Sequence, residues 1–365
     1  MAQGGIVRAV MFAFYVVLFL LVPFTSERTL AQQDVIEKAK QEGEVVVWAH
    51  TFDGADEFVK GFNKIHPYLK VKIWDGRTEE VVNKVITEAK AGKFSPDVVI
   101  LSTRGYPEIH KAGILQKYPW PEQTKRWPNQ PAHGFWKITA ASLRLPSYNT
   151  NLVRPADVPK SWEDLKSPRW AGKSVISSSG ADAPLLFADL WKKPNGNLDW
   201  ERSFGFWSEV IKTAKPKTIR GFTAGFDAIA SGEVSIFLLS SVNSAVLFME
   251  RGAPIKMAPV GRTMGSTWGI GIPKTIPHPN GTKLFVDYLL SEEGLLSYVN
   301  KAKVVALDPA VVERADANVA MKQLGVEWYP IDDETRSDQD VTRATRWWTT
   351  ELGMRRGKAD RKKKQ

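Results

Sequence analysis

The chain has 365 residues, 43% of them hydrophobic, and it contains no cysteine. Single hydrophobic cores stop growing at about 250–300 residues, so this length favours two lobes over one large domain. The lack of cysteine excludes disulfide frameworks, thiolate metal sites and cysteine nucleophiles.

Much of the net charge of +10 lies at the C-terminus, where residues 354–365 hold seven basic residues and one aspartate. A terminal run of like charge is typical of a disordered, solvated tail. No zinc-finger, helix-turn-helix or RNA-binding motif accompanies it, so we expect no nucleic-acid partner.

The N-terminus resembles an export signal. Arg8 precedes an uninterrupted apolar run of fourteen residues, Ala9 to Val22, and Thr29-Leu30-Ala31 offers a small residue at a cleavage point. The run is shorter than the roughly 18–20 residues that span a membrane. We therefore expect residues 1–31 to be a cleaved signal peptide and the mature protein to be periplasmic, with an uncleaved anchor as the alternative.

Strands and helices alternate in the first third of the chain. The predicted strands are Glu44–Ala49, Lys70–Trp74 and Val98–Leu101. The predicted helices are Asp34–Gln41, Ala55–Ile65 and Glu79–Ala91, the last with Thr78 as its N-cap. This order predicts a parallel sheet with helices on both faces, and ligands of such sheets bind beyond the carboxyl ends of the strands. The candidate ligand loops are His50–Gly54, Asp75–Arg77 and Ser102–Gly105.

A second run of α/β units follows an extended segment, Phe135 to Leu145. Its predicted strands are Lys173–Ile176 and Val234–Leu239, and its predicted helices are Pro184–Trp191 and Trp200–Thr213. Beyond it, Ile255–Val260 and Thr267–Pro273 are extended, while Lys283–Leu290, Glu292–Val299 and most of 316–352 are helical. Trp347 and Trp348 are expected to pack onto a lobe.

Several separated motifs resemble the periplasmic solute-binding proteins of ABC importers, in the branch that includes ferric-iron, thiamine, polyamine and phosphonate binders. The first-lobe motifs are PDVVILST (96–103) and AGIL (112–115). The later motifs are YNTNLV with VPKSWEDLKSPRWAGK (within 148–173), SGEVSI (231–236), RGAPI (251–255) and IPHPNGTKLFVDYLLSEEG (276–294).

The resemblance implies an α/β fold of type II: two lobes, each a mixed or parallel sheet flanked by helices, joined by crossing hinge strands. The hinge would lie near Leu143–Tyr148 and Lys256–Val260. We expect residues 32–143 and 258–353 to form lobe 1 and residues 144–257 to form lobe 2. The implied partners are a small-molecule ligand and the permease subunits of the inner membrane, with the protein itself a monomer.

The family's ligand residues are only partly present. In the iron binders two adjacent tyrosines ligate Fe(III), and Val242-Asn243 stand where those tyrosines would fall, so we expect no tyrosinate iron site, no metal and no cofactor. The anion loop of that branch resembles Ser179-Gly180-Ala181. A helix N-terminus there suits a phosphate or carboxylate, although the same small residues would also make a tight turn. Arg77, Arg104 or Arg220 would add a bidentate hydrogen-bonded interaction with such an anion.

Aromatic residues give a second indication of the ligand. Trp48 and Trp74 fit the core, whereas Trp268 is expected to face the cleft and stack on a ligand. The full set of candidate ligand-binding residues is His50, Thr51, Arg77, Thr103, Arg104, Ser178, Ser179, Gly180, Ala181, Ser240, Ser241, Asn243 and Trp268.

Enzyme motifs are incomplete or missing. Ala171-Gly172-Lys173-Ser174 ends like a P-loop, but Ser167 occupies the place of the upstream glycine and a strand follows instead of a helix. No GxSxG motif occurs. We therefore expect no enzyme but a transport protein for an anionic organic, phosphate-like or phosphonate-like solute. A ferric complex whose chelator supplies the oxygens is the first alternative. An exported hydrolase using His50 and Asp53, and a sensor subunit, are the others.

Overall fold

The computed structural model describes residues 23–50, 52, 55–93, 96–330 and 338–353. Residues 1–22 of the predicted signal sequence lie outside the described residues, its residues 23–31 lie in the first helix, and the basic tail 354–365 lies wholly outside the described residues. Both therefore remain predictions. Within the described ranges, no helix is long and apolar enough to cross a membrane.

The described strands form one 11-stranded mixed sheet whose main path runs β2-β1-β3-β9-β4-β7-β5-β6. The strands are β1 Glu44–Ala49, β2 Lys70–Asp75, β3 Val98–Ser102, β4 Trp136–Asn149, β5 Ser174–Ser177, β6 Lys217–Ile219, β7 Ile236–Ser241, β8 Ile255–Met257, β9 Arg262–Gly271, β10 Val305–Ala306 and β11 Glu327–Pro330. The helices are α1 Pro23–Glu42, α2 Ala55–Ile65, α3 Thr78–Lys90, α4 Tyr106–Lys111, α5 Ala183–Leu190, α6 Trp200–Ala214, α7 Phe222–Ala230, α8 Val242–Glu250, α9 Pro279–Leu289, α10 Glu292–Ala302, α11 Asp316–Leu324 and α12 Asp338–Glu351.

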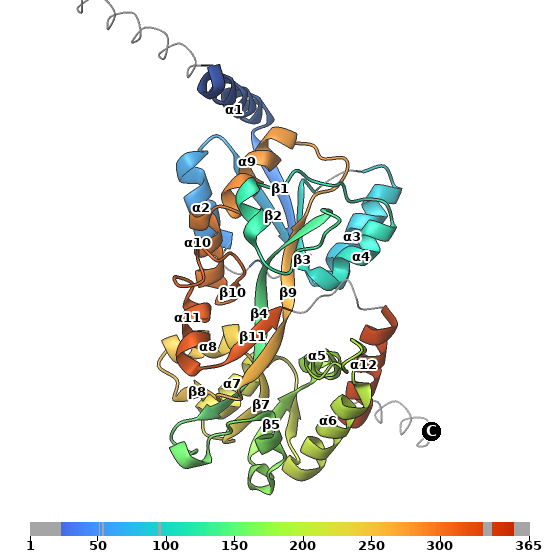
Figure 1. Ribbon diagram of the computed structural model, residues 1–365, viewed down its shortest axis with the longest axis vertical. Helices are drawn as coiled ribbons and strands as arrows, with labels where there is room; N and C mark the ends of the chain where they lie inside the picture. Colours follow the sequence, from blue (N-terminus) through green and yellow to red (C-terminus); the bar gives the residue numbers. More distant parts are fainter. Residues whose placement is uncertain (1–22, 51, 53–54, 94–95, 331–337, 354–365) are drawn as a thin grey trace, which may run out of the picture.

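The first lobe is built on β1, which pairs in parallel with β2 and β3. Helices α2, α9 and α10 cover one face of this sheet, and α3 and α4 cover the other (Figure 1). Phe58 of α2 packs edge-on against Phe285 of α9, with ring centroids 5.1 Å apart. The apolar stripe of α2 is therefore buried against the helix that follows β9, far along the chain.

The second lobe is built on β5, which pairs in parallel with β6 and β7. Helices α5 and α6 lie on one side of it and α7 and α8 on the other (Figure 1). The two lobes thus share the α/β construction predicted from the alternating strands and helices.

Strands β4 and β9 run antiparallel through both lobes. The first part of β4 pairs with β9, and its last part, from Arg144 to Tyr148, pairs with β7. The register shifts between Leu145 and Ser147, around Pro146, whose nitrogen has no hydrogen to donate. This irregularity falls inside the segment 143–148 expected to be a hinge, and we retain that hinge, with its partner near 256–260, as a proposal.

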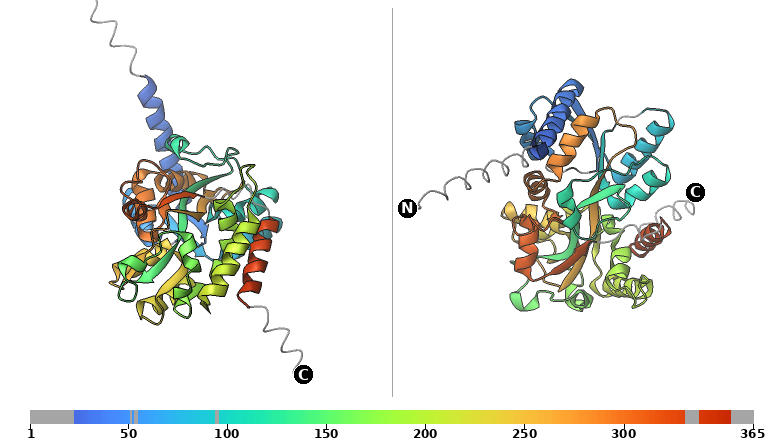
Figure 2. Two further views of the ribbon diagram at one scale, coloured as in Figure 1. Left: turned by 60° about the horizontal axis from the view of Figure 1, so that its bottom comes forward. Right: turned by 45° about the horizontal axis from the view of Figure 1, so that its top comes forward.

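The C-terminal region differs from the expectation of continuous helix over 316–352. It contains strand β11, which pairs in parallel with β9. Helix α12 then lies against α5 and α6 of the second lobe, as both views of Figure 2 show. We therefore assign residues 338–353 to lobe 2 instead of lobe 1, and we otherwise keep the lobe boundaries as a proposal.

Trp348 attaches α12 to the second lobe, whereas the sequence predicted only that it packs onto a lobe. Its side chain is fully buried, packs edge-on against Trp207 at 5.3 Å, and donates a hydrogen bond to the Ser177 carbonyl at 3.2 Å. One local expectation was wrong in detail, because Arg77 is the N-cap of α3 in place of Thr78.

Candidate ligand-binding cleft

A cavity of about 490 Å³ lies between the lobes, where the loops after β1, β2 and β3 meet β4, β9 and the start of α5. Its lining is rich in serine, arginine and acidic side chains. The lining residues are His50, Arg77, Glu79, Ser102, Arg104, Ser142, Arg144, Ser179, Ala181, Asp182, Leu185, Leu186, Phe222, Ser241, Asn243, Ser244, Ser266, Trp268, Val341, Ala344 and Thr345.

Many of the candidate residues from the sequence lie at this cleft. The structure brings together His50, Arg77, Arg104, Ser179, Ala181, Ser241, Asn243 and Trp268. Thr51 lies outside the described residues. Contact between any of these residues and a ligand remains a prediction.

Four candidates do not line the cleft. The Ser240 hydroxyl is buried and donates to the Leu145 carbonyl at 2.7 Å, while its strand neighbour Ser241 faces the cleft. Thr103 is buried and hydrogen-bonded to Thr267, so Ser102 takes its place at the cleft wall. The other two are Ser178 and Gly180. Neighbouring strand residues point to opposite faces, so a one-residue difference moves a side chain out of the site.

The loop expected to hold an anion is less open than predicted. Ser178–Gly180 form a 3₁₀ turn, and α5 begins only at Ala183. The N–H of Ser179 is already bonded to the Ser177 hydroxyl at 3.1 Å. The loop therefore offers fewer free donors than a helix beginning directly after the strand would.

Arg144 is the cleft cation that the sequence analysis missed. It lies on β4 and is 7% exposed. Its Nη2 donates to Asp182 Oδ2 at 3.2 Å and its Nη1 to the Ser142 hydroxyl at 3.3 Å. Its Nε is buried and has no hydrogen-bond partner among the described residues. A charged residue in the mainly apolar extended segment from Phe135 to Leu145, which also holds Lys137, was the available signal, because a buried cation needs partners.

The arginines named from the sequence are already paired or lie elsewhere. Arg77 donates to Glu80 at 2.7 and 2.9 Å, and Arg104 donates to Glu79 at 2.6 Å. Arg220 is exposed and does not line the cleft. Arg77 and Arg104 are thus each neutralised by a neighbouring glutamate, while Arg144 retains a donor for a ligand.

His50 and Trp268 form an aromatic wall, with ring centroids 4.8 Å apart. His50 Nδ1 is hydrogen-bonded to the Thr78 hydroxyl at 2.6 Å. Burial, and then the charge of Arg104, lower the pKa of His50 below its usual value, so the imidazole is neutral at pH 7. The indole Nε1 of Trp268 is buried without a partner in the described part of the chain. Trp48 and Trp74 pack on each other at 5.8 Å, outside the cleft.

The cleft shows no ready-made metal site. No group of three or more histidine, cysteine or acidic side chains suited to a metal occurs among the described residues. At the position where tyrosines would fall, Val242 is buried and Asn243 Oδ1 accepts a hydrogen bond from Ser142 at 3.0 Å. The donor set present, mainly serine and arginine, suits an oxyanion better than a bare cation.

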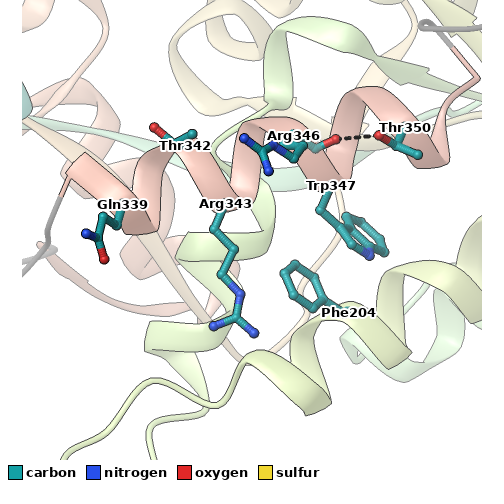
Figure 3. Close-up of a pocket in the computed structure, with 7 residues that line it drawn as sticks. All are labelled: Phe204, Gln339, Thr342, Arg343, Arg346, Trp347 and Thr350. Carbon is teal, nitrogen blue, oxygen red and sulfur yellow. Dashed lines mark hydrogen bonds between the residues drawn. The ribbon is translucent and has the colours of Figure 1, made fainter.

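A second cavity, of about 580 Å³, lies between α6 and α12 on the second lobe alone (Figure 3). There Trp347 stacks on Phe204 at 4.8 Å, and the Arg343 guanidinium lies 4.7 Å from the centre of the Trp200 ring. Because only one lobe lines it, closure of the lobes would not enclose a solute there.

Two lobes, paired crossing strands and a polar cavity between them define a periplasmic binding protein of type II. Residues 49–295 match the family of bacterial extracellular solute-binding proteins, and the chain belongs to that family. Its relatives are solute-binding proteins and not enzymes, as the missing catalytic motifs predicted.

The chain is similar to two curated proteins that are named for iron uptake or Fe(3+) binding. It is 26% identical to "Iron uptake protein A1" of Synechocystis sp. over 252 residues, 61% of this chain and 64% of the relative. It is also 26% identical to the "Fe(3+)-binding periplasmic protein" of Serratia marcescens over 224 residues, 59% of each. The chain thus spans about three-fifths of the length of these relatives.

Solved structures share the fold. The Trichodesmium protein IdiA (FutA), described in complex with iron and citrate ligands, has a TM-score of 0.64 at 21% identity, covering 85% of this chain and 99% of that one. AfuA from Actinobacillus pleuropneumoniae, described with exogenous fructose-6-phosphate bound, has a TM-score of 0.61 at 18% identity, covering 85% and 99%. At such identities the likeness shows the type II fold alone.

Proposed function

We propose that the protein is the solute-binding component of an ABC importer in the periplasm. It captures a solute between its lobes, closes about the crossing strands β4 and β9, and presents the solute to the permease in the inner membrane. Family membership, the type II fold and a polar cleft between the lobes support this proposal. Closure is driven by contacts that the ligand makes in the closed state and lacks in the open one.

The proposed solute is an anion, and Arg144 carries this part of the proposal. Its buried guanidinium leaves Nε without a partner among the described residues, and an unsatisfied buried charged group is costly. A carboxylate or phosphate oxygen in the cleft would satisfy it with a charge-assisted hydrogen bond. The serine side chains around it supply neutral donors for the remaining oxygens of such a group.

The curated relatives favour the ferric alternative over a free phosphate-like anion. Two of them are named for iron uptake or Fe(3+) binding. The described residues that line the cleft include no tyrosine, and the described chain has no cluster of histidine, cysteine or acidic metal ligands. Iron would therefore enter this cleft as an anionic complex whose chelator fills the metal's coordination sphere. The similar structure described with iron and citrate supports this form of the proposal.

A melting-temperature screen of the purified protein tests the proposal. The panel contains phosphate, a sugar phosphate, citrate, ferric citrate, uncomplexed ferric ion, spermidine and thiamine. A ligand at a hundred times its dissociation constant stabilises the folded state by about 2.7 kcal/mol. We expect stabilisation by anions, largest for ferric citrate if iron is the cargo. Stabilisation by spermidine or thiamine alone would refute the anion proposal, and turnover of any compound would favour the hydrolase.

A further inference from the structure

Three polar atoms of residues that line the cleft are buried without a hydrogen-bond partner in the part of the chain that the structure describes. Two are donors, Arg144 Nε and Trp268 Nε1, and the third is an acceptor, Asp182 Oδ1. Buried polar groups are normally satisfied, so such a set in one cavity indicates the complementary groups of a ligand. The donors require an acceptor, and Asp182 requires a donor.

Asp182 is directed to the cleft rather than to its own helix. It is the N-cap residue of α5, yet its side chain accepts no hydrogen bond from the helix backbone. An N-cap aspartate normally satisfies one of the free N–H groups of the first turn. Here Oδ2 instead accepts from Arg144 at 3.2 Å and from the Ser266 hydroxyl at 3.0 Å. The side chain of Asp182 therefore bonds to β4 and β9 and does not cap α5.

We propose that the ligand carries a hydroxyl group beside its anionic group, as in a hydroxycarboxylate or a phosphorylated polyol. Arg144 Nε holds an oxygen of the anionic group, and Asp182 Oδ1 accepts the hydrogen bond of the hydroxyl. This inference rests on the proposed function, since it presupposes an anionic solute in the cleft. It adds a rule of selectivity, because an anion without a hydroxyl leaves Asp182 Oδ1 unpaired on closure.

An ammonium group would also donate to Asp182, but the charges of the cleft favour a neutral donor. Arg144 already balances the charge of Asp182. Arg77 and Arg104 are likewise balanced by Glu80 and Glu79, so no unpaired carboxylate charge is left in this set to attract an ammonium group. A second cation brought beside Arg144 would meet repulsion at short range.

Three matched sets of probes test the rule by calorimetric titration of the full chain. The first set is citrate with tricarballylate, which lacks only the hydroxyl. The second is malate with two analogues. Succinate has a hydrogen in place of the hydroxyl, and aspartate has an ammonium group there. The third is glycerol 3-phosphate with propyl phosphate. In any set that binds, the hydroxylated member is expected to bind about ten- to a hundredfold more tightly.

The variant Asp182→Ala tests whether Asp182 causes the preference for the hydroxylated probe. It removes the acceptor and also frees Arg144, so the affinity of the probe without a hydroxyl is kept or rises, and the preference falls to about onefold. Asp157→Ala is the matched control, because Asp157 is likewise paired with arginines, at 2.7 and 2.9 Å, but lies outside the cleft. It is expected to keep the full preference. Since the preference is first measured on the unaltered protein, the test does not depend on the folding of a variant.

Equal binding within every set that binds, tightest binding of aspartate, or an unchanged preference in Asp182→Ala would each overturn the inference. Binding of other anions while all probes of the three sets fail would overturn it as well. In each of these cases the proposed function still holds if an anion binds to the wild-type protein and binds more weakly to Arg144→Gln. If no anion binds at all, the proposed function fails together with the inference.

Discussion

Arg144 and Asp182 form an ion pair, with Nη2 and Oδ2 3.2 Å apart, that joins the crossing strand β4 to the N-terminus of α5. Each partner keeps one buried atom without a partner among the described residues, Nε on the arginine and Oδ1 on the aspartate. A ligand can therefore engage both residues without breaking the pair. The pair also couples the proposed hinge to the ligand site, because Arg144 lies within 143–148.

Trp348 is expected to be the main anchor of α12. Trp348→Ala removes a fully buried indole that packs on Trp207, and such truncations cost about 3–5 kcal/mol of unfolding free energy. Because Val341, Ala344 and Thr345 of the same helix line the cleft, ligand affinity should fall as well. Chemical denaturation and ligand titration measure the two effects.

The neighbouring Trp347→Ala is the control for that variant. Trp347 is only half buried and stacks on Phe204 at the surface cavity, so the loss of stability should be clearly smaller. Equal losses from the two variants would show that Trp348 has no special role in attaching α12.

Trp268 is expected to donate to the anionic ligand through its indole nitrogen. Trp268→Phe keeps an aromatic ring beside His50 but removes the unpartnered Nε1 donor. A charge-assisted hydrogen bond contributes about 1.5–3 kcal/mol, so affinity should fall about ten- to a hundredfold. Trp74→Phe, which alters an exposed tryptophan outside the cleft, should leave affinity unchanged. Wild-type affinity in Trp268→Phe would contradict a donor role.

His50 should make anion binding dependent on pH. In the free protein its pKa is lowered by burial and by Arg104, and a bound anion would raise it again because it favours the imidazolium. Between the two pKa values the complex binds more protons, so affinity for a carboxylate increases as pH falls through the interval between the bound-state pKa and the lowered pKa of the free protein. The charges facing His50 are those of Arg104, Glu79, Asp75 and Glu80. His50→Gln should abolish the increase.

As pH falls, the contribution of His50 to folding stability should decrease, whereas its contribution to anion affinity increases. Unfolded histidine, with a pKa of about 6.5, takes up a proton before the buried His50 does. The contribution of His50 to stability is therefore present above that pH and is lost as pH falls through its lower folded value. His66 has a lowered pKa too but lies outside the cleft. His66→Gln should alter only the pH dependence of stability; a change in the pH dependence of affinity would refute the assignment to His50.

Uncomplexed ferric ion should bind weakly. The resemblance places Val242, which is buried, and Asn243, which lines the cleft, where the iron binders have tyrosines. No tyrosinate-to-iron absorption band is therefore expected when ferric ion is added without a chelator. Titration followed by visible absorption measures this. A strong band would contradict this expectation, because no tyrosine is among the described residues that line the cleft.

The fold was largely accessible from the sequence. Continuous apolar runs such as Glu44–Ala49 and the alternation with amphipathic helices predicted the strands of the first lobe almost residue for residue. Strand β11 was missed because it is short and lies between helical segments. The position of α12 was also missed, because packing onto a distant lobe leaves no periodic signal beyond the two tryptophans.

The candidate ligand-binding residues could be predicted only in part from the sequence. Loop residues after parallel strands, such as His50, Arg77 and Arg104, were placed by topology alone. Arg144 and Asp182 were missed because their importance arises from pairing across 38 positions of sequence. The choice between Ser240 and Ser241 depends on which face of β7 meets the cleft, and Ser102 ends β3 whereas Thr103 begins the 3₁₀ turn after it. The sequence around these strand ends did not indicate which side chains face the cleft.

The most direct measurement is calorimetric titration of the anion that stabilises the protein most, with wild type and Arg144→Gln compared. Gln removes the charge and the Nε donor, so affinity should fall about ten- to a hundredfold, equivalent to about 1.5–3 kcal/mol. Arg220→Gln, on an exposed arginine outside the cleft, should bind as wild type does. Equal affinities for wild type and Arg144→Gln would contradict an anion site at Arg144.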